Sequence, residues 1–90
     1  MKVEICGVMH DVVYQNKQHD NNMGRWVEKA CIIEIDESMN KQVQSHTLWH
    51  EFFHAVLHMQ GDSELGNSED FVNRLATSMI NSSVAMLNAE

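Results

Sequence analysis

The first 36 positions of the chain alternate between apolar and polar residues over several short stretches, whereas apolar residues in the second half recur every three or four positions. A period of two is typical of strands with one buried face, and a period near 3.6 is typical of amphipathic helices. Strands followed by helices favour an α+β domain, and we expect its small sheet to be antiparallel.

Two stretches in the first half have strand character. Residues 2–15 alternate well enough for one or two strands, and residues 30–36 form the clearest strand. The apolar face of this clearest strand carries Cys31, Ile33 and Ile35. Between the two stretches, the polar residues 19–24 predict a turn.

Two helices are predicted in the second half. The first spans residues 39–60 and ends before Gly61, which is a typical C-terminal stop. Its apolar residues recur at helical spacing: Leu48, Phe52, Ala55, Val56 and Met59. The second spans residues 68–88, with Asn67 or Ser68 as the N-cap. Because this helix is strongly apolar for so small a domain, it could leave a patch through which the chain forms a homodimer.

The first predicted helix contains the motif H-E-x-x-H, formed by His50, Glu51 and His54. Residues four apart lie on one face of a helix, so the two histidines can bind a single ion. Glu51 is offset by one position and can reach a water molecule on that ion. Two histidine ligands beside a carboxylate base are what a zinc peptidase needs. The competing interpretation is a core helix whose two histidines happen to lie four apart.

A catalytic zinc site needs a third protein ligand. Three of the downstream acids are expected in a turn or at the chain end: Asp62, Glu64 and Glu90. Glu69 and Asp70 remain, although acids in the first turn of a helix are also common because they complement the helix dipole. We expect Glu69 to be the third ligand, with Asp70 as the alternative. Asn73, one turn further on, could form a hydrogen bond that orients a ligand.

His46 and His58 extend the histidine stripe of the first predicted helix by one turn on each side. Three interpretations compete: exposed residues beside the site, contacts to the substrate or oxyanion, and ligands of an adventitious second metal. His58 lies two turns from His50, about 12 Å, which is too far for both to bind one ion.

Other polar side chains are weaker candidates. Tyr14 and Arg74 could donate a hydrogen bond to an oxyanion, although a tyrosine in a strand is more often a packed aromatic residue. His10 and His19 are expected to face solvent or to lie in turns.

The chain has 90 residues, enough for a single domain spanning residues 1–90. Its net charge is −7, and its six basic residues are scattered, so we expect no nucleic-acid-binding surface. No segment has the pattern of a signal peptide or a membrane span, so we expect no membrane partner and a cytoplasmic location. The start Met-Lys-Val-Glu-Ile suggests a complete small protein.

Cys6 and Cys31 are isolated in the sequence. The absence of C-x-x-C argues against a cysteine-type zinc site. Each cysteine falls in an apolar run, so we expect buried and reduced thiols.

The motif and the later acid together resemble the ImmA/IrrE-type metallopeptidases, a gluzincin-like family common in bacteria, prophages and phages. The resemblance is carried by residues 47–58 (TLWHEFFHAVLH) and 69–76 (EDFVNRLA). Residues 24–36 also resemble the strand that precedes the active-site helix in small phage-encoded members. The resemblance covers roughly residues 24–80, and its first motif is the specific one.

The resemblance implies a minimal zincin-like core, in which a small sheet precedes the active-site helix and a second helix supplies the third ligand. It implies zinc ligands at His50, His54 and Glu69, with Glu51 as the general base. In the resembled fold, the strand at residues 30–36 lies along the cleft.

The implied function is that of a zinc-dependent metallo-endopeptidase that hydrolyses a peptide bond of a protein substrate in the cytoplasm of a bacterial host. The substrate implied by the family is a regulatory protein such as a repressor. One alternative is a zinc-containing, non-catalytic binding module of phage or prophage origin, which the small size of the chain and the loss of later family segments favour. A second alternative is a metal-free structural protein.

Overall fold

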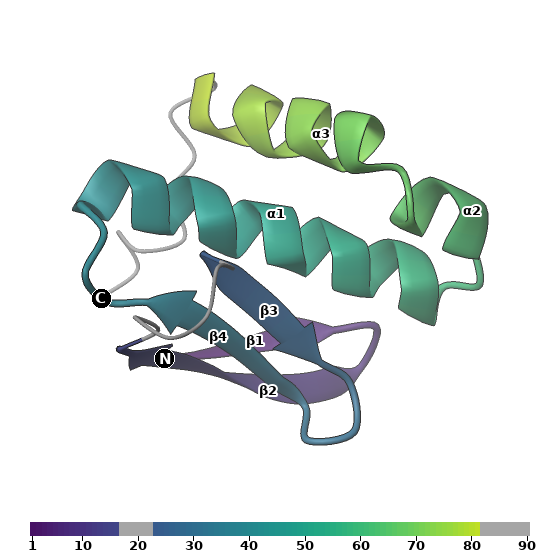
Figure 1. The fold of residues 1–90 in the computed structure, drawn as a ribbon. Helices are drawn as coiled ribbons and strands as arrows, with labels where there is room; N and C mark the ends of the chain where they lie inside the picture. The colour runs from purple at the N-terminus through teal and green to yellow at the C-terminus, as the bar shows by residue number, and fades with distance from the viewer. Residues whose placement is uncertain (17–22, 82–90) are drawn as a thin grey trace.

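The computed structural model describes residues 1–16 and 23–81. Most of the predicted turn, residues 19–22, and the predicted second helix beyond residue 81 lie outside the described residues, as does His19. The described part confirms the α+β class, with a four-stranded sheet followed by helices (Figure 1).

The sheet has the strand order β1-β2-β4-β3. Its strands are β1 (Lys2–Ile5), β2 (Val8–Gln15), β3 (Gly24–Val27) and β4 (Ile32–Asp36). The predicted antiparallel sheet is wrong, because β2 and β4 pair in parallel while β1–β2 and β3–β4 are antiparallel. The reason is topological: β4 lies between β2 and β3, so the chain direction reverses twice between β2 and β4. β3 is left at one edge of the sheet and β1 at the other.

One face of the sheet carries the apolar core. Ile5, Val12, Ile33 and Ile35 are buried and form one cluster with Leu48 and Ala55. The predicted burial of Ile33 and Ile35 on one face of this strand is therefore confirmed, whereas Cys31 precedes β4 and is not part of that face. Hydrophobic burial of this face is the main force that holds the sheet against the helix above it.

Several predictions about single residues are wrong. His10 was expected at the surface, but it is 1% exposed and shares the buried face of β2 with Val12. Cys6 is exposed, and Cys31 is only partly buried. Both cysteines have positive φ angles, 49° and 53°, because they lie where the backbone turns sharply beside a strand. A turn exposes its side chains, so neither thiol reaches the core.

The first helix, α1 (Lys41–Met59), is slightly shorter than predicted. Its start is set by Asn40, whose side-chain oxygen accepts a hydrogen bond from the Val43 N–H at 2.9 Å. The predicted apolar stripe faces the sheet: Leu48 and Ala55 are buried, and Phe52, Val56 and Met59 pack against the same core.

Two further helices follow α1. The short α2 (Ser63–Gly66) occupies the region predicted as a turn, with Asp62 as its N-cap and Glu64 within it. The second long helix, α3 (Glu69–Asn81), begins after Ser68, whose hydroxyl accepts a hydrogen bond from the Phe71 N–H at 3.3 Å.

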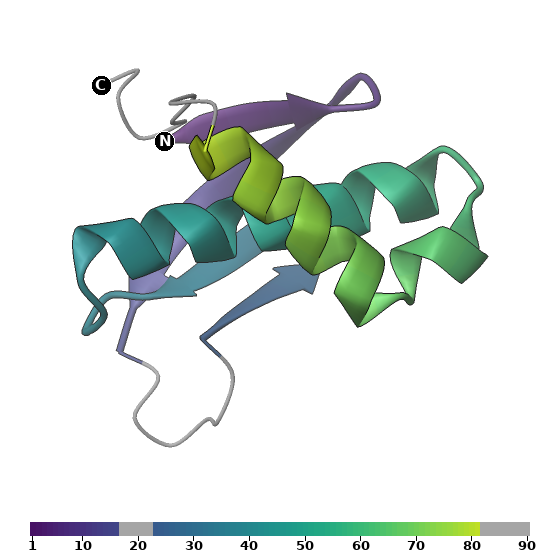
Figure 2. The same cartoon turned by 90° about the horizontal axis from the view of Figure 1, so that it is seen from above.

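The elements form three layers, with α1 between the sheet and α3 (Figures 1 and 2). α3 crosses the outer side of α1 and runs in roughly the opposite direction, burying Val72 and Ala76. In residues 1–16 and 23–81, no helix is both long enough and apolar enough to cross a membrane.

Candidate metal centre

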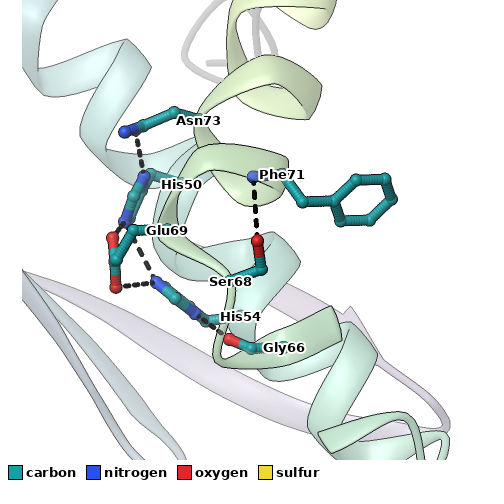
Figure 3. A network of polar contacts seen from close by, with 7 residues as sticks. All are labelled: His50, His54, Gly66, Ser68, Glu69, Phe71 and Asn73. Atoms are coloured by element: carbon teal, nitrogen blue, oxygen red, sulfur yellow. Dashed lines mark hydrogen bonds and ion pairs between the residues drawn. The ribbon is translucent and has the colours of Figure 1, made fainter. Parts of the chain in front are cut away.

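The α1–α3 interface brings together the three side chains predicted as metal ligands (Figure 3). The Nε2 atoms of His50 and His54 lie 3.0 Å apart. One carboxylate oxygen of Glu69 lies 3.0 Å from the His50 Nε2, and the other lies 3.1 Å from the His54 Nε2. The histidines are partly buried, with side chains 16% and 14% exposed, whereas the Glu69 side chain is 68% exposed.

Each histidine is oriented by its other ring nitrogen. The His50 Nδ1 lies 2.7 Å from the Asn73 Oδ1, and the His54 Nδ1 lies 2.6 Å from the Gly66 carbonyl oxygen. Both partners are acceptors, so each Nδ1 carries a hydrogen and donates it. This is the arrangement that fixes metal-binding histidines in structures of metalloproteins. In the neutral form of both rings, the two Nε2 atoms are therefore acceptors that lie within 4.8 Å of the Glu69 carboxylate.

The chemistry of this donor set fits a divalent cation. Two Nε2 lone pairs and a carboxylate meet within 4.8 Å, and such groups repel one another unless a positive charge lies between them. A single proton can be held by only one Nε2 of the pair at a time, whereas one cation can bind all three ligands. Ligands of a tetrahedral zinc ion lie about 3.3 Å apart, close to the distances found here.

Glu51 lies on the same helix but points to the opposite wall of the site. Its carboxylate accepts a hydrogen bond from the backbone N–H of Trp26 in β3. Burial raises the pKa of the Glu51 carboxyl, although His50, His54 and the Trp26 hydrogen bond act in the other direction. A raised pKa makes the carboxylate a stronger base near neutral pH.

The site opens into a cleft of about 620 Å³ between α1, α3 and β3. β3 and the preceding Met23 supply the wall opposite His50, His54 and Glu69, through residues Met23 to Trp26. The expectation that the strand at residues 30–36 lies along the cleft is therefore wrong, because β4 is an inner strand and β3 lies at the edge. Strand order is a long-range property, which the sequence pattern did not contain.

Gly24 allows β3 to lie this close to α1. A Cβ atom at this position would come within 2.5 Å of the Thr47 Cγ2 and 3.0 Å of the Glu34 carbonyl oxygen. It would also lie 3.4 Å from the Cγ of Glu51. The absence of a side chain at Gly24 therefore brings the edge strand and the Glu51 carboxylate together.

The remaining predicted site residues divide into two groups. His58 lines the cleft, where its ring lies 5.9 Å from that of Trp26, and Asn73 lies against His50 as described. Asp70 is an exposed partner of Arg74 at 2.7 Å and is not part of the cluster. Arg74 and Tyr14 do not line the cleft, and Tyr14 packs against the core instead.

His46 also lines the cleft, one turn before His50. Its Nε2 lies 3.3 Å from the Thr77 hydroxyl of α3. Burial lowers the pKa of His46, and the nearby His50 adds to this effect. His46 therefore favours the neutral form and supplies hydrogen bonding rather than charge.

Among the residues of the site that were not predicted, Gly24, Trp26 and Gly66 have the clearest roles. Gly66 supplies the carbonyl that binds His54, and it lies so close to His58 that a Cβ would come within 2.8 Å of the ring. Gly24 is the first residue of β3 and Gly66 is the last residue of α2, so neither interrupts a regular pattern that would mark a close backbone approach in the sequence. No sequence signal marks Trp26 either.

We expect Asn73→Ala to weaken metal binding about 10-fold to 100-fold, because the His50 ring loses the acceptor that orients it. Zinc affinity measured by competition with a chelating dye tests this. The matched control is Thr77→Ala, which removes a contact between the same two helices that involves no ligand. Equal affinities of the Asn73→Ala variant and the wild type would contradict the orienting role.

Comparison of the chain with protein-family models, curated proteins and solved structures gave no match. The class that the fold and the site define is a small α+β domain with a cluster of two histidines and one glutamate that could hold a metal ion.

Proposed function

We propose that this protein is a zinc-dependent metallo-endopeptidase. The observation that carries the proposal is the convergence of His50, His54 and Glu69 on one point beside an open cleft, with the Glu51 carboxylate on the facing side. Two histidines, one carboxylate ligand and an adjacent carboxylate base make up the donor set of hydrolytic zinc sites.

A bound zinc ion would supply a Lewis acid that polarises a carbonyl group and acidifies water. The role of Glu51 is to take a proton from water in the cleft and return it to the departing amine. The Trp26 N–H holds the carboxylate in place for this transfer, and burial strengthens it as a base. His58 and His46 line the cleft and can contact a bound peptide.

The resemblance of the two motifs to ImmA/IrrE-type peptidases supports the same reaction and suggests a regulatory protein as the substrate, in a bacterial cytoplasm. A folded protein substrate would have to present an extended segment, because the cleft is bounded on one side by the edge strand β3.

One observation favours a second candidate function, that of a zinc-containing module that binds a protein without cleaving it. The three ligands come from α1 and α3, so an ion bound there would also join the two helices of a small domain. In this case the metal would support the fold and Glu51 would have no chemical task.

Incubation of the zinc-loaded protein with a library of peptides of mixed sequence separates the two functions. We expect new amino termini, detected by mass spectrometry, that disappear when a chelator removes the metal and return when zinc is restored. If the protein binds one zinc per chain and produces no cleavage in the library or in a host protein extract, the peptidase proposal fails and the binding module is favoured.

A further inference from the structure

His10 has no task in the proposed reaction, yet it is the most deeply buried of the described histidines. Its side chain lies on the face of β2 that packs against α1, beside the apolar residues Ile5 and Val12. A polar ring in such a place destabilises the fold unless both nitrogens are hydrogen-bonded. An apolar side chain would fill the same space without that requirement.

Both nitrogens of His10 are engaged. The Trp26 indole N–H donates to the His10 Nε2 at 3.3 Å. Because Nε2 is the acceptor, the ring hydrogen is on Nδ1, which donates to the Val8 carbonyl oxygen at 3.0 Å. His10 is in β2 and Trp26 is in β3, so the indole reaches across the intervening strand β4.

Trp26 also touches the candidate active site. Its backbone N–H donates to the Glu51 carboxylate, and its ring packs near the ring of His58 at 5.9 Å. The indole therefore connects the edge strand β3 to the inner strand β2, at the residue of β3 that contacts Glu51. The tight approach of Gly24 to α1 leaves little space for β3 to settle elsewhere.

We propose that His10 is a positioning residue that acts through Trp26 to hold the β3 edge, and with it the Glu51 carboxylate, in place in the cleft. The link between His10 and Trp26 stands on their hydrogen bond, and the link from β3 to Glu51 stands on the close approach of Gly24 to the Glu51 side chain and on the Trp26 backbone N–H. The catalytic consequence rests on the proposed peptidase function. An error in the position of a base of the order of 1 Å can reduce turnover about 100-fold.

Three variants test this proposal. His10→Leu removes the acceptor of the indole N–H, and His10→Gln keeps one, because its side-chain oxygen can take the place of Nε2. Val12→Ala is the matched control, since Val12 lies two residues further along the same buried face of β2. If His10→Leu fails to fold, Trp26→Phe tests the same hydrogen bond, because it removes the indole N–H that donates it.

We expect all folded variants to bind one zinc per chain. Hydrogen exchange of the Trp26 indole N–H and backbone amide can be followed by NMR. Exchange should be about tenfold faster in His10→Leu than in Val12→Ala, compared where the two variants have the same free energy of unfolding. His10→Gln should restore slow exchange. With a cleaved peptide in hand, kcat should fall about tenfold or more in His10→Leu while KM changes little.

The backbone amide of residue 26 is present in both His10→Leu and Trp26→Phe. Hydrogen exchange of this amide at the wild-type rate in both variants would overturn the proposal. An unchanged kcat in a variant with faster exchange would overturn its catalytic part. If the wild type cleaves no peptide, the peptidase proposal fails by itself, and the exchange data still decide whether His10 holds β3.

Discussion

Glu51→Gln is expected to abolish peptide cleavage while the protein still binds one zinc per chain. Glutamine has the shape of glutamate, and its side-chain oxygen can still accept the hydrogen bond from the Trp26 N–H. It cannot take up a proton near neutral pH. Loss of a general base reduces turnover about 10²-fold to 10⁴-fold, so cleavage should fall to the background rate in most assays.

The measurement is the initial rate of cleavage of one library peptide by wild type and variant at equal zinc content. Glu64→Gln is the matched control, since Glu64 is an exposed glutamate in α2 that does not line the cleft. We expect the control to cleave at the wild-type rate. A Glu51→Gln variant as active as the wild type would rule out Glu51 as the base.

His54→Ala is expected to remove the metal from the protein. The change deletes one of three ligands and leaves the Gly66 carbonyl without its donor. Because orienting contacts alone alter affinity by about 10-fold to 100-fold, loss of a ligand should exceed that range. Thermal unfolding in the presence of zinc should also distinguish the two proteins. A ligand at 1,000 times its Kd stabilises the folded state by about 4 kcal/mol, and zinc should give His54→Ala almost none of this stabilisation.

Elemental analysis of protein purified without an affinity tag and without added metal tests this expectation, with circular dichroism as the check on folding. We expect about one zinc in the wild type and less than a tenth of that in His54→Ala. His58→Ala is the control, because His58 lies one turn further along the same stripe and is not in the cluster. A wild type that takes up no zinc would rule out the metal centre altogether.

The parts of the fold that the sequence predicted are those set by local patterns. The apolar stripe of α1 repeats at helical spacing, and α3 begins after Ser68, one of its two predicted N-caps, whose hydroxyl accepts a hydrogen bond from the Phe71 N–H. His50 and His54 lie four apart on one helix, so the proximity of their rings could be predicted without knowledge of the fold. Glu69 could be predicted as the third member of the cluster because it is one of two acids in the first turn of the predicted second helix, and an H-E-x-x-H site lacks a third ligand.

The parts that the sequence did not predict depend on contacts between distant segments. The parallel pairing of β2 with β4 arises because β4 lies inside the sheet, and no local pattern distinguishes an inner strand of this length from an edge strand. The role of β3 as the wall of the cleft follows from the same order. α2 has only four residues, too few for a helical period to appear.

The burial of His10 also depends on a contact with a distant segment, and the sequence therefore did not predict it. It lies two positions before Val12 on β2, so the alternation placed it on the buried face, but the polar character of histidine argued for the surface. Its burial is possible because Trp26, sixteen residues away, supplies a donor across another strand. A pattern within one strand cannot contain that partner.

The row of contacts between α1 and α3 also determines how far one helix can slide along the other. Glu69, Asn73 and Thr77 follow one another by one turn, and they meet His54, His50 and His46 in reverse order. The buried residues Val72 and Ala76 are also four apart, so apolar packing alone would tolerate a shift of one turn, about 5.4 Å. Such a shift would place Asn73 opposite His54 and move the carboxylate away from the histidine pair. The contacts of His46, His50 and His54 with α3 therefore select one sliding position of α3 among several that packing would accept.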